Sequence, residues 1–138
     1  MKRLDKRITT KEDLRELTLL GKKGVKQGRL ETFPNHHRER DYVVTLRTGE
    51  FTCVCPVTGQ PDFAKLEISY IPDERVLESK SLKLYLQSFR NTGAFHEHVV
   101  NTILDDLVRV LSPRWCKITA HFAVRGGIGI SVEGEWKK

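Results

Sequence analysis

A cysteine and an aspartate frame a short stretch that could carry nucleophilic chemistry. Cys55 precedes Asp62 by seven residues, and the prolines and glycine between Cys53 and Asp62 predict a loop. A loop held by rigid strands gives a nucleophile access to its substrate. The thiolate is the attacking form, so a positive or hydrogen-bonding surround would have to lower the pKa of this thiol. The alternative is that Cys55 is a small, half-buried core residue, as free cysteines usually are.

Hydroxyls and cations gather between Leu77 and His98, at the start of a helical pattern. The residues concerned, with one carboxylate among them, are Glu78, Ser79, Lys80, Ser81 and Lys83. A helix N-terminus with free N–H groups and two lysines suits an anion, phosphate above all. The alternative is a solvated helix start held by salt bridges.

Glu97 lies near the predicted start of the next helix, where the helix dipole stabilises a carboxylate. A carboxylate at this position can accept two N–H bonds from the edge of a guanine-like ring. On position alone, a surface glutamate that complements the dipole is the simpler interpretation.

Cysteines and histidines are numerous enough to raise the question of a metal site. The candidate ligands are Cys53, Cys55, His96, His98, Cys116 and His121. Zinc sites favour Cys-x2-Cys and His-x3-His types of spacing, whereas this chain has Cys-x-Cys and His-x-His. On a helix, two residues two apart point about 200° away from each other. We therefore expect no bound metal.

The composition indicates a single domain with an anionic ligand. The chain has 138 residues, which suits one domain over 1–138. The odd count of three cysteines argues against a disulfide framework. The net charge of +6 favours nucleic acid, a nucleotide cofactor or an acidic surface, but aromatic residues do not cluster with the basic ones. The charged N-terminus and the lack of a long apolar run predict a cytoplasmic location.

The elements that must position these residues follow the order β-β-α-α-β-β. Alternating or β-branched patterns predict strands over 41–52, 63–71, 115–124 and 128–132, and helical spacing predicts helices over 79–90 and 95–111. Tight turns are expected at 72–75 and 125–127. Residues 1–40 form an N-terminal arm, with a short helix through Leu20. This order predicts an α+β fold, an antiparallel sheet with both helices on one face. The exposed edges of so small a sheet make its continuation across subunits, and hence a ring, an expectation.

Four stretches carry a family resemblance. They are residues 51–63 around Cys55, residues 78–85 (Glu-Ser-Lys-Ser-Leu-Lys-Leu-Tyr), residues 95–97 (Phe-His-Glu) and residues 125–128 (Arg-Gly-Gly-Ile). They resemble the short, unimodular form of the NADPH-dependent nitrile reductases that make queuosine precursors, the 7-cyano-7-deazaguanine reductases. The resemblance covers about residues 14–133. That family has the tunnelling fold (T-fold), a β-β-α-α-β-β unit that assembles into rings, in agreement with the order predicted above.

The resemblance implies a covalent mechanism. Cys55 would add to the nitrile carbon of 7-cyano-7-deazaguanine to give a thioimide, with Asp62 as the general acid. Two NADPH molecules would supply two hydrides in turn, and the product would be the primary amine, 7-aminomethyl-7-deazaguanine. Glu97 would hold the pyrimidine edge of the substrate and His96 would lie close to the reacting group. Neither metal nor flavin is implied.

The remaining implied roles concern binding and assembly. Leu77, Glu78 and Ser79 would line the base pocket. The residues facing the NADPH phosphates would be Lys80, Ser81 and Lys83. The implied partners are the small deazapurine and further copies of the chain, as pentameric rings stacked into a decamer, with no membrane and no direct nucleic acid. No role is implied for Cys53.

Two other functions stay open. One is a zinc-dependent hydrolase of the same fold, like GTP cyclohydrolase, with Cys and His ligands. The other is a non-catalytic basic module that binds RNA. The ligand spacing argues against the first, and the density of motif residues around Cys55 argues against the second.

Overall fold

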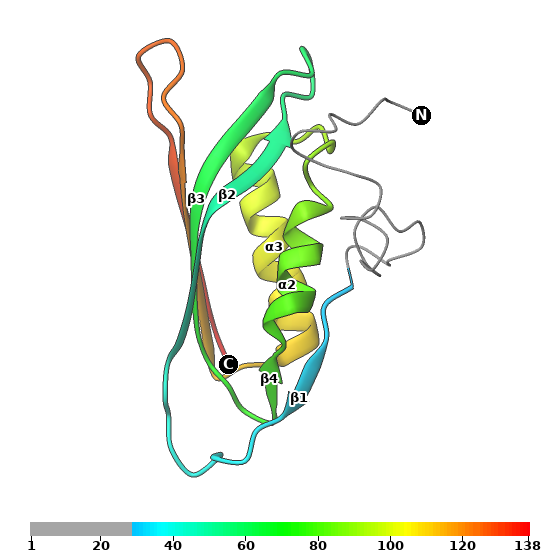
Figure 1. Ribbon diagram of the computed structural model, residues 1–138. Helices are drawn as coiled ribbons and strands as arrows, with labels where there is room; N and C mark the ends of the chain where they lie inside the picture. Colours follow the sequence, from blue (N-terminus) through cyan, green and yellow to red (C-terminus); the bar gives the residue numbers. More distant parts are fainter. Residues whose placement is uncertain (1–28) are drawn as a thin grey trace, which may run out of the picture.

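The computed structural model describes residues 29–138 and shows an α+β fold (Figure 1). Helices α2 (Ser79–Gln87) and α3 (His96–Leu111) run in opposite directions on one face of a four-stranded antiparallel sheet. The strands, in spatial order, are β2 (Val44–Val54), β3 (Pro61–Ile71), β5 (Trp115–Phe122) and β6 (Ser131–Lys137). The predicted fold class is confirmed, and the four strands of this sheet and the two helices follow the predicted order. The predicted helix before Leu20, and most of the predicted arm, lie outside the described residues.

The hydrophobic core lies between the sheet and the two helices. Helix α3 buries one stripe, made of Val99, Val100, Ile103, Leu104, Leu107 and Leu111. Strand β5 turns alternate residues toward that stripe, namely Cys116, Ile118, Ala120 and Phe122. Because side chains alternate between the faces of a strand, the intervening residues point to the opposite, polar face. His121 is exposed there, as predicted from its position between Ala120 and Phe122.

A second, two-stranded sheet was missed by the sequence analysis. Strand β1 (Thr32–Pro34) pairs antiparallel with β4 (Arg75–Leu77). The prediction placed β1 in an irregular arm and ended a turn at Arg75. Three residues are too few to show an alternating pattern, so only the pairing itself reveals these strands.

The strand boundaries also differ from the prediction. Strand β2 continues through Val54 and β3 begins at Pro61, so the predicted loop 53–62 is in fact residues 55–60. Proline is tolerated at the first residue of a strand, where the missing N–H costs little. The last strand is Ser131–Lys137 rather than 128–132. Smaller differences are that β2 starts at 44, α2 ends at 87, and β5 ends at 122.

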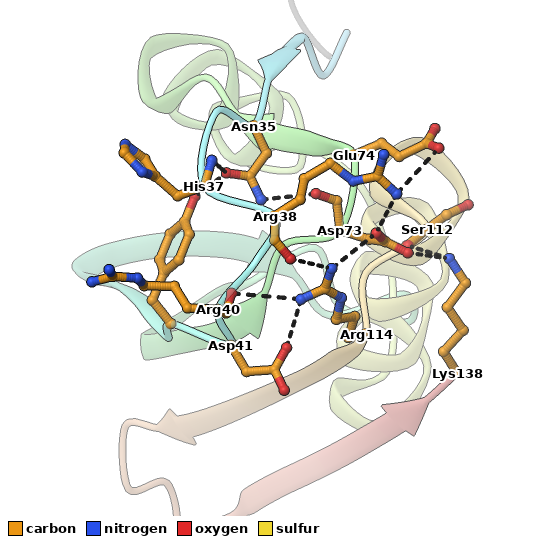
Figure 2. A network of polar contacts seen from close by, with 11 residues as sticks. Asn35, His37, Arg38, Arg40, Asp41, Asp73, Glu74, Ser112, Arg114 and Lys138 are labelled. Carbon is orange, nitrogen blue, oxygen red and sulfur yellow. Dashed lines mark hydrogen bonds and ion pairs between the residues drawn. The ribbon is translucent and has the colours of Figure 1, made fainter.

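Charged side chains gather around Asp73 at the end of the molecule where β4 and the end of α3 lie (Figure 2). The Asp73 carboxylate accepts hydrogen bonds from Arg38 at 3.2 Å, Arg114 at 3.4 Å and Lys138 at 2.8 Å. Arg114 also donates to the Asp41 carboxylate at 2.6 Å. These contacts, which we call the Asp73 network, join the segment after β1 to the last residue of the chain. Within the described part of the chain, no helix is long and apolar enough to cross a membrane.

Candidate active site

The loop of residues 55–60 presents Cys55 at the end of β2. The Cys55 N–H donates to the Gln60 carbonyl at 2.8 Å, and the Gly59 N–H donates to the Cys55 carbonyl at 2.9 Å. Gly59 has a φ of 71°, a left-handed conformation that glycine adopts without strain. The loop therefore closes on itself and leaves Cys55 half-buried, whereas Cys53, inside the strand, is fully buried.

The connection between the two helices holds the end of β2 beside α3. The Val54 N–H donates to the Thr92 carbonyl at 3.0 Å, and the Ala94 N–H donates to the Val54 carbonyl at 3.1 Å. A Cβ atom added to Gly93 would lie 3.2 Å from the Cα of Pro56. This close approach brings the cysteine loop against the segment that leads into α3.

Hydrogen bonds make Cys55 the most easily ionised of the three cysteines. Contacts with the side chain and backbone of Thr58, and with the backbone of Val57, lower the pKa of Cys55 below its ordinary 9.0. The Thr58 N–H lies 3.5 Å from the Cys55 Sγ. Burial instead raises the pKa of Cys53 to about 11 and that of Cys116 to about 11. The hydrogen bonds around Cys55 therefore provide the environment that a nucleophilic thiol needs.

The Asp62 carboxylate is held through both of its oxygens. Its Oδ2 lies 3.3 Å from Nε2 of His96, and its Oδ1 lies 3.2 Å from Nε of Arg125. The side chain is only 10 % exposed. The negative charge of Asp62 acts to raise the pKa of Cys55, but less strongly than the hydrogen bonds from Thr58 and Val57 lower it.

His96 brings α3 into this site. It is the first residue of the helix, and its imidazole stacks on the ring of Phe122 with centroids 3.8 Å apart and planes 8° apart. Its neighbour Glu97 is exposed in the first helical turn. The structure thus brings Asp62 and His96 into direct contact beside the Cys55 loop, with Glu97 next along the helix.

Three further residues at this site had been given no role in it: Thr58, Phe122 and Arg125. Thr58 follows Cys55 by three residues in a turn, a spacing at which a threonine commonly bonds back along the chain, so a signal was present. Phe122 was assigned to the core and Arg125 to a hairpin turn. Nothing in the spacing of these two residues shows that they reach His96 and Asp62.

The second group of predicted residues lies around the start of α2. Leu77 is buried, and its N–H donates to the Tyr70 hydroxyl at 2.9 Å. The Glu78 carboxylate caps the helix, accepting the N–H groups of Lys80 at 2.7 Å and Ser81 at 2.8 Å. The prediction of free N–H groups for an anion is therefore wrong for these two residues, because the chain supplies its own carboxylate. Ser79, Lys80 and Lys83 are exposed.

Ser81 differs from its neighbours because it points inward. Its side chain accepts the Glu31 N–H at 2.9 Å and donates to the Glu78 carbonyl at 2.7 Å, and the residue is 4 % exposed. Such a hydroxyl ties the segment before β1 to the helix. The predicted contact of Ser81 with a cofactor phosphate does not fit this geometry.

The two groups lie at opposite ends of the helix pair (Figure 1). Helix α2 starts beside β4 and, with nine residues, is about 14 Å long. Helix α3 starts near the far ends of β2 and β3, where Val54 contacts Gly93. Glu78 and Glu97 therefore do not share a site within one copy of the chain.

A groove of about 500 Å³ runs between α2 and the strands β2 and β3. Its walls include the apolar side chains of Leu46, Phe51, Leu66, Ile68, Leu82 and Leu86. Ser79 and Lys83 on α2, and Arg90 just after it, contribute polar groups to the groove. Over residues 29–138, no three His, Cys, Asp or Glu side chains are grouped so as to hold a metal ion.

The chain is similar in sequence to proteins of known function. Residues 61–138 match the family model described as QueF-like protein. The NADPH-dependent 7-cyano-7-deazaguanine reductase of Syntrophus aciditrophicus is 68 % identical over 130 residues, which cover 94 % of this chain and 93 % of the relative. The protein of the same name from Alkalilimnicola ehrlichii is 61 % identical, covering 79 % of this chain and 84 % of the relative.

A solved structure is also similar. The crystal structure of the archaeosine synthase QueF-Like in the apo form aligns with a TM-score of 0.63 at 26 % sequence identity. The alignment covers 67 % of this chain and 91 % of that one.

Proposed function

Because the chain belongs to the family of NADPH-dependent 7-cyano-7-deazaguanine reductases, we propose that Cys55 is the residue that attacks the nitrile of the substrate. The reaction reduces the nitrile of 7-cyano-7-deazaguanine to a primary amine, 7-aminomethyl-7-deazaguanine, in the route to queuosine. The observation that carries the assignment is a thiol of lowered pKa in the loop that leads into Asp62, whose carboxylate lies 3.3 Å from the His96 imidazole. A free thiol of this kind suits the reducing cytoplasm, where we place the reaction.

Addition of the Cys55 thiol to the nitrile needs no reactant other than the enzyme and the substrate. The proton leaves the Cys55 thiol for the Asp62 carboxylate, the sulfur forms a bond to the nitrile carbon, and one π bond of the nitrile breaks. Asp62 then acts as general acid and gives the proton to the nitrile nitrogen, which yields a neutral thioimide. His96, 3.3 Å from Asp62, holds the carboxylate beside the nitrogen.

NADPH supplies two hydrides, one for each two-electron step from the thioimide to the amine. Lys80 and Lys83 are exposed cations on α2, and Lys83 lines the groove between α2 and the sheet. Cations beside a groove suit the phosphates of a dinucleotide. Ser81 supports this site from inside by fixing the start of α2, not by contact with a phosphate.

The substrate site is completed by a second copy of the chain. Glu97, exposed beside His96, would accept two N–H bonds from the pyrimidine edge. Leu77, Glu78 and Ser79, at the other end of the helix pair, reach the same substrate from a neighbouring copy. Within residues 29–138, no strand pairs with the outer edges of β2 and β6, so the sheet can continue between copies, and we propose pentameric rings stacked as a decamer.

Exposed apolar side chains support an interface at the end of the molecule that carries the cysteine loop. Five of them come from this loop and from the segments near it, namely Val57, Phe63, Phe95, Val124 and Ile128. Large apolar groups gathered in this way favour burial against another surface. Burial there would also keep water from the thioimide, which can hydrolyse.

The test measures NADPH consumption and product amine together, with 7-cyano-7-deazaguanine as substrate. We expect two NADPH oxidised per amine, and a mass increase on Cys55 when the nitrile is added without NADPH. Cys55→Ala should remove both the adduct and the amine, while continued turnover by this variant would disprove the assignment of the nucleophile. Asp62→Asn should slow adduct formation by about 10²- to 10⁴-fold.

The cofactor site is tested separately from the addition step. Lys80→Ala and Lys83→Ala should raise the KM for NADPH and leave the rate of adduct formation unchanged, because NADPH takes no part in that step. Lys65→Ala, on the opposite face of the sheet, serves as the control. An unchanged KM in both α2 variants would place the phosphates elsewhere.

The shared site is tested by mixing inactive variants. Cys55→Ala and Glu78→Gln each disable a different half of the site, and glutamine retains an oxygen to cap α2. If sites form between copies, dissociating and reassembling the two variants together should restore part of the activity. No recovery in properly assembled mixtures would mean that each copy carries a whole site.

A zinc-dependent hydrolase is not favoured by the arrangement of the described residues. The cysteines and histidines considered as ligands are spread between β2, the loop of residues 55–60, β5 and the start of α3, and Cys53 and Cys116 are buried in the core. Metal analysis and a chelator distinguish the two functions. Stoichiometric zinc in the purified protein, together with loss of activity when a chelator is added, would support the hydrolase.

A further inference from the structure

Arg125 contacts three acceptors at the junction between the cysteine loop and β3. Its Nε lies 3.2 Å from Oδ1 of Asp62, and its Nη1 donates to Oε1 of Gln60 at 3.0 Å. Its Nη2 donates to the carbonyl of Pro61. One guanidinium thus contacts three consecutive residues, the last of which carries the carboxylate of the site.

The backbone fixes the place from which Arg125 reaches these acceptors. The N–H and carbonyl of Arg125 both bond to Ile128, each at 3.0 Å. Between them Gly126 and Gly127 have φ values of 58° and 78°, which a two-residue hairpin turn of this kind requires. The Ala123 N–H donates to the Phe63 carbonyl at 2.8 Å and ties the hairpin to β3.

The guanidinium completes a two-sided hold on Asp62. His96 contacts one carboxylate oxygen and Arg125 contacts the other, so rotation of the carboxylate about its terminal torsion is restricted. Arg125 also fixes Gln60, whose carbonyl accepts the Cys55 N–H. The orientation of the Asp62 carboxylate therefore depends on one side chain from a different hairpin.

We propose that Arg125 is a positioning residue for the addition of Cys55 to the nitrile, and that it acts through Asp62. The inference rests on the proposed function, since the step is the one described there: the thiol proton passes to Asp62 and then to the nitrile nitrogen as the S–C bond forms. Arginine suits this task because its planar fork donates to several acceptors at once, which the single ammonium of lysine cannot do in the same geometry.

The test is a double-mutant cycle on the rate of adduct formation, measured by rapid quench and intact mass with the nitrile and no NADPH. The proteins are the wild type, Arg125→Met, Asp62→Asn and the double variant. We expect Arg125→Met to slow the adduct by about 10- to 100-fold in the wild-type background, as for a misplaced catalytic group. In the Asp62→Asn background the same change should have little further effect, because residues that act as a unit are not additive.

Two outcomes overturn the inference. One is an equal slowing by Arg125→Met in both backgrounds, which would show that it does not act through Asp62. The other is an unchanged adduct rate with impaired NADPH oxidation, which would assign Arg125 to the cofactor instead. In both cases the wild type still forms the adduct, whereas failure of the wild type to do so would refute the proposed function itself.

Two variants guard against a trivial loss of structure. Arg109→Met removes another exposed arginine paired with a carboxylate, 13 residues from His96 on α3 and so about 20 Å along the helix, and should leave the adduct rate unchanged. Arg125→Lys keeps the charge but not the fork, and should recover only part of the rate. Full recovery with lysine would mean that charge alone suffices and would overturn the positioning role.

Discussion

The imidazole of His96 lies flat on the ring of Phe122, with centroids 3.8 Å apart and planes 8° apart. The same imidazole directs Nε2 at Asp62, 3.3 Å away. Phe122 is buried at the end of β5, so a rigid position in the sheet sets the plane of a histidine that comes from a helix. A side chain from the core thus determines the direction in which a site residue points.

Phe122→Leu should loosen His96 without unfolding the protein. Leucine fills part of the core but offers no flat surface, so we expect adduct formation to slow by about 10-fold or more, since small displacements of catalytic groups are costly. The free energy of unfolding should fall by only about 1 kcal/mol. Ile118→Val, on the same strand and face, removes core volume about 13 Å away and provides the control for lost packing alone. Equal rates in the two variants would show that the stacking does not matter.

Thr58 offers a way to change the pKa of Cys55 directly. Its side chain is the largest cause of the lowered pKa, so Thr58→Val should raise the pKa of Cys55 toward 9.0 and reduce the thiolate fraction near neutral pH. The midpoint of the iodoacetamide alkylation rate should then move to higher pH. The shift should be partial, because the backbone contacts of Thr58 and Val57 remain. Superimposable alkylation profiles would contradict this role for the hydroxyl.

The other two cysteines make that measurement simple. Burial raises the pKa of Cys53 to about 11 and that of Cys116 to about 11, and both are inaccessible in the folded chain. Intact mass should show one modification at neutral pH, absent in Cys55→Ala. Two or three modifications in the native state would mean that the core opens more readily than the packing indicates.

The main elements were predictable because an element with one buried face has a periodic pattern of apolar residues in its sequence. Alternation in β3 and β5 and the apolar stripe of α3 each follow from one buried face, and the structure confirms them. The short strands β1 and β4 have too few residues to show such a pattern. The start of β3 was misjudged because the prolines and glycine in 53–62 were taken to exclude a strand, whereas Pro61 is the first residue of β3.

The site was predictable in its parts but not in its arrangement. The family resemblance pointed to Cys55, Asp62 and His96, yet the contact between Asp62 and His96 depends on a bridge between Val54 and Gly93 that no local pattern shows. The separation of Glu78 from Glu97 was implicit in the prediction, since a helical hairpin puts the starts of its two helices at opposite ends. The role of Arg125 depends on where its side chain reaches, which sequence spacing does not specify.

Gly93→Ala should disturb the cysteine loop more than the fold. The added Cβ would lie 3.2 Å from the Cα of Pro56, a backbone neighbour of Cys55 that has to shift by a few tenths of an ångström. We expect slower adduct formation with a nearly unchanged unfolding midpoint in urea. Gly49→Ala is the matched control, because nothing lies within 4 Å of its added Cβ. If both variants form the adduct at the wild-type rate, the close packing of Pro56 on Gly93 does not position the nucleophile.

The Asp73 network should stabilise the fold in a pH-dependent way. Hydrogen bonds from Lys138 and Arg38, with the charge of Arg114, lower the pKa of Asp73 from 3.8 to about 2 in the folded state. A carboxyl group whose pKa is lowered by folding contributes stability above its unfolded pKa and loses that contribution as the pH falls through the folded one. The loss should therefore occur between about pH 4 and pH 2.

Asp73→Asn isolates this contribution, because every other carboxylate titrates in both proteins. The variant should be less stable than the wild type in urea at pH 7, and the difference should shrink as the pH falls from 4 toward 2. High salt should also reduce the difference in stability between the two proteins, since the cations that surround Asp73 are partly exposed. Glu74→Gln changes an adjacent, more exposed carboxylate that reaches Arg38 at 3.5 Å and should give a smaller difference. A difference for Asp73→Asn that stays constant from pH 7 to pH 2 would mean that the lost stability comes from packing, not from the charge that joins the two segments.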